Sequence, residues 1–149
     1  MVVVSRSITM VAALTLAGLA GCTTRANLTN AAVNLEYNAN ALERDAGDEL
    51  ARTDDTTDDP RTGGYARDAR ALARSAHELR VAVEERASDG EVRAAFARVS
   101  RSYHAVRNEV THSDSHQARR DLVPVTDSYR AVEHELGIRP GRDEYVPPA

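Results

Sequence analysis

Apolar residues recur along most of the chain at alternating spacings of four and three, which is typical of helices with one buried face. Four such stripes predict helices over about residues 27–52, 65–87, 89–111 and 116–136. The six stripe positions of the successive helices are Leu28, Ala32, Leu35, Ala39, Leu42 and Ala46; Tyr65, Ala69, Leu72, Ala76, Leu79 and Val83; Val92, Phe96, Val99, Tyr103, Val106 and Val110; and Ala118, Leu122, Val125, Tyr129, Val132 and Leu136. We expect these positions to form the core.

Polar and helix-breaking residues separate the stripes. Thr53 to Gly64 contain aspartates, a proline and two glycines and predict a loop. Ser88 and Glu91 have the spacing of a capping box at the start of the third helix. Pro124 should kink the fourth helix near its beginning or mark its start, and residues 138–149 are predicted to be irregular.

The last two predicted helices resemble each other beyond their stripes. Val99–Val110 and Val125–Leu136 align at an offset of 26 and are identical at six of twelve positions, which indicates an internal duplication. Four helices of similar length joined by short connections predict an all-α fold, an antiparallel up-down four-helix bundle over residues 27–137. The alternative is a pair of helical hairpins that complete their core by dimerising.

A leader precedes the first predicted helix. Residues 1–7 form a short segment whose one charge is Arg6, and a 13-residue apolar run from Ile8 to Ala20 follows. This layout is typical of a signal peptide, and the run is shorter than the roughly 20 apolar residues that span a bilayer. Leu19-Ala20-Gly21-Cys22 resembles the lipobox of bacterial lipoproteins. The resemblance implies that residues 1–21 are removed and that Cys22 is lipidated.

The same resemblance implies where in the cell the protein is located. Lipoproteins with aspartate after the cysteine are retained in the inner membrane, whereas Thr23 follows Cys22 and favours the outer membrane, facing the periplasm of the cell envelope. Residues 22–26 would be a short tether that holds the domain near the lipid. An ordinary secretory leader that contains a cysteine is the alternative. Cys22 is the only cysteine, so the chain has no intramolecular disulfide.

Composition excludes several classes of function. Without Arg6 the chain has 18 basic and 23 acidic residues, so it is acidic and a nucleic-acid partner is not expected. Every basic residue is arginine. The Cys-x-x-Cys-His motif of covalent haem attachment is missing. The stripes hold no Glu-x-x-His pair of the kind that binds two metals inside a bundle. The sequence therefore predicts no cofactor and no catalytic residues.

Four groups of residues have chemistry that invites a second interpretation. His112, Asp114 and His116 have the types of metal ligands but lie in a predicted turn. Tyr103 and Tyr129 occupy equivalent stripe positions and could contact a ligand, or pack in the core. The aspartates of residues 54–59 lack the pattern of an EF-hand loop. A row on the first helix, Val33, Tyr37 and Ala41, either widens the core or docks a partner.

These observations predict a lipid-anchored, non-enzymatic helical-bundle protein of the bacterial cell envelope with a binding or scaffolding role. We expect it to contact the membrane through Cys22, to be a monomer or homodimer, and to meet a protein partner in the envelope. The alternative is a carrier of a metal or small ligand that uses the loops far from the membrane or the core around the tyrosines.

Overall fold

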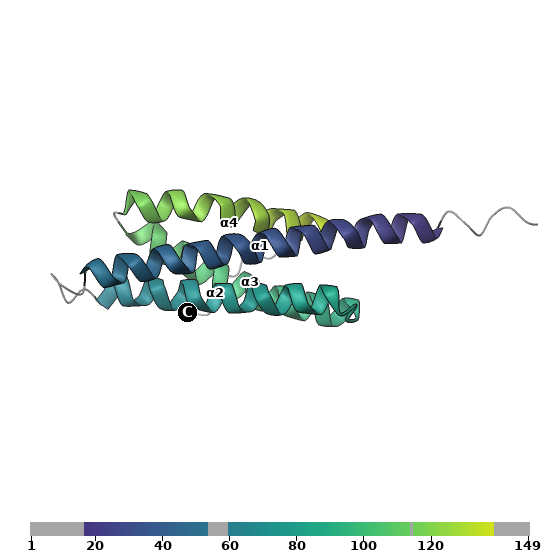
Figure 1. The fold of residues 1–149 in the computed structure, drawn as a ribbon, viewed down its shortest axis with the longest axis horizontal. Helices are drawn as coiled ribbons and strands as arrows, with labels where there is room; N and C mark the ends of the chain where they lie inside the picture. Colours follow the sequence, from purple (N-terminus) through teal and green to yellow (C-terminus); the bar gives the residue numbers. More distant parts are fainter. Residues whose placement is uncertain (1–16, 54–59, 114, 139–149) are drawn as a thin grey trace, which may run out of the picture.

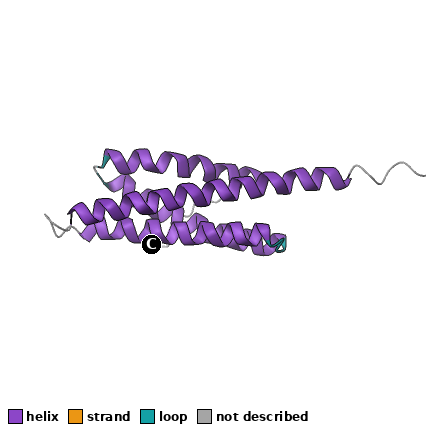
Figure 2. Ribbon diagram, viewed as in Figure 1, coloured by secondary structure: helices purple, strands orange, loops and turns teal. Residues whose placement is uncertain are grey.

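The computed structural model describes residues 17–53, 60–113 and 115–138, and the regular structure within these ranges is helical. The four helices are α1 (Ala17–Thr53), α2 (Pro60–Glu84), α3 (Asp89–His112) and α4 (His116–Glu135). Figure 2 shows them with their short connections and no strand in this part of the chain. The prediction of an all-α protein with four helices is confirmed.

Helix α1 begins at Ala17, ten residues before the predicted start, so residues 22–26, which were predicted to be a short tether, are helical. The apolar stripe marks where a helix packs on the core, whereas the helix itself continues as far as local propensity allows. This stretch has no proline, and the Arg25 carbonyl accepts a hydrogen bond from Thr29 Oγ1 at 3.0 Å. The prediction of a start at Asn27 is therefore wrong.

Both ends of α2 also differ from the prediction. The helix begins at Pro60 and includes Gly63 and Gly64, because proline is favoured in the first helical turn, where its missing N–H is not needed. It ends at Glu84, three residues early, because Arg86 adopts a left-handed conformation with φ of 59°. The Arg86 and Ala87 amides then donate to carbonyls of the last helical turn.

The ends of α3 and α4 follow the predicted signals. The Ser88 amide donates to Glu91 Oε2 at 2.8 Å and the Glu91 amide donates to Ser88 Oγ at 3.3 Å, which confirms the capping box. Ser115 caps α4 by accepting from the Ala118 amide at 3.1 Å. Gly137 ends α4 with φ of 65°, a conformation that glycine adopts without strain.

The helices lie side by side, with α1 against α2 and α4 and α2 also against α3, while the first turns of α1 project beyond the ends of the other helices (Figure 1). The backbones of α3 and α4 approach each other at fewer points. Every predicted stripe position is buried except Leu28 and Leu136, which are half-buried and pack on the same core. Buried residues that the stripes did not include are Ala31, Ala66, Ala73, Ser75, Ala95 and Ser128.

Helix α4 continues through Pro124 as one helix. The proline removes the donor to the carbonyl of Arg120, which is an exposed residue. The Pro124 carbonyl accepts hydrogen bonds from Asn38 Nδ2 at 3.1 Å and from Ser128 Oγ at 2.9 Å. Asn38 also donates to Ser128 Oγ, and it lies half-buried between α1 and α4.

The predicted loop of aspartates at residues 54–59 and the predicted tail beyond Ile138 lie outside the described residues, as do residues 1–16 of the predicted leader.

Candidate functional site

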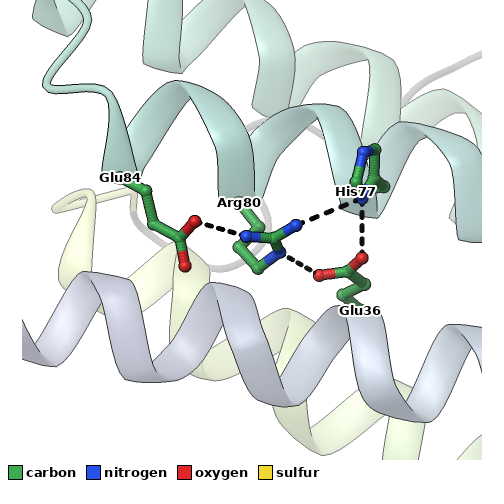
Figure 3. A network of polar contacts seen from close by, with 4 residues as sticks. All are labelled: Glu36, His77, Arg80 and Glu84. Carbon is green, nitrogen blue, oxygen red and sulfur yellow. Dashed lines mark hydrogen bonds and ion pairs between the residues drawn. The ribbon is translucent and has the colours of Figure 1, made fainter.

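A polar network joins α1 to α2 at the point where Glu36 projects between the two helices (Figure 3). Glu36 Oε1 lies 2.7 Å from His77 Nδ1, and Glu36 Oε2 accepts from Arg80 Nε. Arg80 also donates to Glu84, one turn further along α2. One carboxylate therefore receives two hydrogen bonds from the neighbouring helix, and the side chain of Glu36 is only 17% exposed.

The protonation of this network follows from its geometry. A carboxylate only accepts, so the close contact requires a proton on His77 Nδ1, which cannot also accept from Arg80 Nη2 at 3.4 Å. Burial acts to raise the pKa of Glu36, but the hydrogen bonds and positive charges of His77 and Arg80 outweigh it and hold that pKa below 4.5. The network is therefore a charged link between helices.

The sequence located only part of this network. Arg80 and Glu84 are four residues apart, a spacing that favours pairing on one helix, and they bind each other within α2. Arg74 and Glu78 have the same spacing, but Glu78 Oε2 accepts from Arg98 Nε of α3 at 2.9 Å. Glu36 belongs to no sequence motif that would have indicated a contact between helices. The one indication in the sequence is that Glu36 follows Leu35 and therefore lies at the border of the buried stripe.

Aromatic side chains fill the space between α3 and α4. The rings of Tyr103 and Tyr129 stack with centroids 4.2 Å apart, and Phe96 stacks on Tyr129 at 5.2 Å. Tyr129 Oη lies 3.0 Å from Ser100 Oγ, and Tyr103 Oη lies 3.0 Å from Thr126 Oγ1. Burial raises the pKa of Tyr129 to about 12, despite the hydrogen bond with Ser100, which acts to lower it.

These two hydroxyl pairs follow the internal duplication. Ser100 and Thr126 are equivalent under the offset of 26, as are the two tyrosines. Each tyrosine thus meets the hydroxyl that lies three residues before the other tyrosine, as two copies of one helix related by a local twofold axis would do. Both rings are buried and both hydroxyls have partners, so the observed contacts are those of core packing.

The two histidines of the predicted metal-ligand cluster lie at the ends of adjacent helices. His112 closes α3, with Nδ1 2.8 Å from the Asn108 carbonyl, and His116 opens α4. Both are exposed. Asp114, the third member, lies outside the described residues, and within the described part no group of three histidine, cysteine or acidic side chains could hold a metal ion.

Tyr65 has the one buried side-chain polar atom that lacks a hydrogen-bond partner in the described part of the chain. Burial raises the pKa of its hydroxyl, and the carboxylates of Asp121, Glu49 and Asp45 raise it further. The hydroxyl therefore remains neutral.

Cys22 lies in the first turns of α1, and its side chain is not among those described. Arg25, one turn later, donates from Nη2 to the Ala87 carbonyl of the α2–α3 connection at 3.3 Å. None of the helices in the described ranges combines the length and hydrophobicity needed to cross a membrane.

Comparison of the chain with protein-family models, with curated proteins and with solved structures found no match.

Proposed function

We propose that the protein is a lipid-anchored, non-enzymatic scaffold of the bacterial cell envelope, attached to the membrane through Cys22. The observation that carries the proposal is the lipobox Leu19-Ala20-Gly21-Cys22, which lies in the first turns of a helix that packs into the domain. Several acyl chains on one residue hold a protein to a bilayer durably, since each buried CH₂ contributes about 0.8 kcal/mol. Thr23 favours the outer membrane as the site of attachment, with the domain in the periplasm.

The helical start of α1 supports a short and stiff link between lipid and domain. Arg25 follows Cys22 by three residues, a rise of about 4.5 Å in a helix. Its hydrogen bond to the Ala87 carbonyl brings the α2–α3 connection close to the anchored residue. The domain would therefore sit directly on the membrane.

For the domain we propose an antiparallel up-and-down four-helix bundle. Two contacts between the ends of helices support this topology. Arg25 near the start of α1 meets Ala87 after the end of α2, and Arg93 near the start of α3 donates to the Leu136 carbonyl at the end of α4 at 2.9 Å. The α1–α4 pair is joined by Asn38 and Pro124. In this arrangement His112 and His116 lie at the end away from the membrane.

A scaffolding role agrees with how the polar groups are used. Glu36, His77 and Arg80 bind one another across α1 and α2, and the hydroxyls of Tyr103 and Tyr129 bind hydroxyls across α3 and α4. These groups stabilise the packing of helices, and we assign them no reaction and no ligand.

The test is Cys22→Ser in the full chain, expressed in a bacterium that processes lipoproteins, with Thr23→Ser as the matched control. Because acylation of the thiol precedes cleavage, Cys22→Ser should accumulate as the uncleaved precursor and incorporate no labelled palmitate. Thr23→Ser should be cleaved and labelled as the native chain is. Normally sized, membrane-bound protein from Cys22→Ser would refute the anchor.

A further inference from the structure

The outward side of α1 is uncharged over about three turns. Between Arg25 and Glu43 the sequence contains one charged residue, Glu36, although 28% of the whole chain is charged. Glu36 is turned toward α2, where His77 and Arg80 bind it. What remains on the outside is a set of six residues that we call the neutral face: Asn30, Val33, Asn34, Tyr37, Asn40 and Ala41.

The neutral face is well exposed. Tyr37 is 68% exposed and Val33 is 41% exposed, and these are two of the three exposed large apolar residues in the described part of the chain. The third, Val123, lies on α4 between polar residues. Of the predicted row of Val33, Tyr37 and Ala41, the first two are exposed and only Ala41 is half-buried, so the row does not widen the core along its length.

We propose that the neutral face is the surface through which two copies of this chain associate side by side. Cores of protein interfaces are depleted in charge and use tyrosine as an anchor, and this face has no charged residue and exposes Tyr37. The outward sides of α2, α3 and α4 carry arginines and acidic residues along their length. If two copies associated through one of these sides, the charged residues of one copy would face the same charged residues of the other.

The chemistry of the face favours a second copy over an oppositely charged partner. The chain has a formal net charge of −4, so copies repel each other least where neither presents a charge. Asparagine both donates and accepts, so Asn34 of one copy can pair with Asn34 of the other across a twofold axis. The face from Asn30 to Ala41 is about 18 Å long, which corresponds to a small interface and to weak association.

The experiment measures the association of the full chain in a non-ionic detergent by sedimentation velocity, from about 1 to 100 μM. The native chain should form dimers in this range. Tyr37→Arg and Tyr37→Glu should each weaken association at least about tenfold, since like charges would face each other across the axis. Ala105→Arg, which adds the same charge at an exposed position of α3, should leave association unchanged.

A mixture of the two Tyr37 variants separates self-association from any other occupant. Opposite charges would then meet across the axis, so Tyr37→Arg and Tyr37→Glu should dimerise with each other although neither does so alone. Their thermal midpoints should match that of the native chain, because Tyr37 is largely exposed. Three results would overturn the proposal: a native chain that stays monomeric, dimers that are unchanged in either variant, or a mixture that stays monomeric. Any of these results would still overturn it if the face were found to bind vesicles or a different protein. None of these outcomes depends on lipidation of Cys22.

Discussion

At the scale of single residues, the side chains that join the helices lie beside the apolar stripes. Glu36 follows the stripe residue Leu35 and binds α2, and Asn38 precedes Ala39 and binds α4. A polar residue at such a border is close enough to a neighbouring helix to bond with it and still partly solvated, so the cost of its burial is small. These residues join α1 to α2 on one side and to α4 on the other.

The first prediction concerns the pH dependence of Glu36→Gln. The native carboxylate has a lowered pKa in the folded protein, so its contribution to stability is complete above the unfolded value and is lost as the pH falls through the folded value. Glu36→Gln should therefore lower the free energy of unfolding by about 1 kcal/mol at pH 7. The difference from the native protein should vanish once the pH is well below the ordinary pKa of 4.5. Urea denaturation at a series of pH values measures it.

Glu43→Gln is the matched control, because Glu43 also binds α2, through Arg70 Nε at 3.1 Å. The Arg70 side chain is 67% exposed, so solvent screens this pair and its loss should cost less. Equal effects of the two substitutions at pH 7, or a Glu36→Gln effect that does not shrink as the pH is lowered, would contradict the assignment of Glu36 as the charged link.

At the scale of the elements, local chemistry at the ends explains where the helices stop. The Ser88 capping box and Gly137 are recognisable in the sequence, and both function as predicted. The end of α2 at Arg86 could not be recognised in the sequence, because arginine does not normally mark a left-handed residue. Pro60 falls in the predicted loop although it begins α2. The sequence signals are correct where the residue type is specialised for the position and wrong where it is not.

Arg86→Gly should stabilise the protein. The left-handed conformation at Arg86 costs an L-residue roughly 1 kcal/mol or more, and glycine adopts it without that penalty. We expect a gain of about 0.5 to 1 kcal/mol, reduced from the full penalty because glycine also gains entropy in the unfolded chain. Thermal denaturation of the variant beside the native protein measures the gain.

The reverse change at the equivalent position of α4 gives the control. Gly137 has φ of 65°, and apart from its chain neighbours no atom lies within 4 Å of the place that a Cβ would take, so Gly137→Ala meets only the strain of the backbone itself. It should destabilise the protein by about 1 kcal/mol. A lower melting temperature for Arg86→Gly would show that the Arg86 side chain contributes more than its backbone costs.

At the scale of the whole molecule, the all-α fold and nearly the whole core could be predicted, because a buried helix face repeats along the sequence itself. The Tyr103 and Tyr129 packing could be anticipated for the same reason, since the duplication placed them at equivalent positions. The network of Glu36 with His77 could not be predicted, because it depends on which helix lies beside α1 and at what height. Asp114 and the aspartates at 54–59 lie outside the described residues, so the hypotheses about them stay predictions.

The lipid anchor and the association of two copies fit together in the whole molecule. An anchor at Cys22 would hold α1 by its first turns and leave the neutral face, ending at Ala41, close to the membrane. Copies anchored in one bilayer are confined to a layer, which raises their effective concentration and favours a weak side-by-side contact. The anchor is the central claim, because it fixes the compartment and the orientation of everything else.

The most direct test of that claim is the intact mass of the protein extracted from the membranes of a bacterium that expresses the full chain. We expect a species that begins at Cys22 and carries the added mass of a diacylglyceryl group, with or without a further amide-linked acyl chain. A species that retains Met1, or that begins at Cys22 without lipid, would contradict the account.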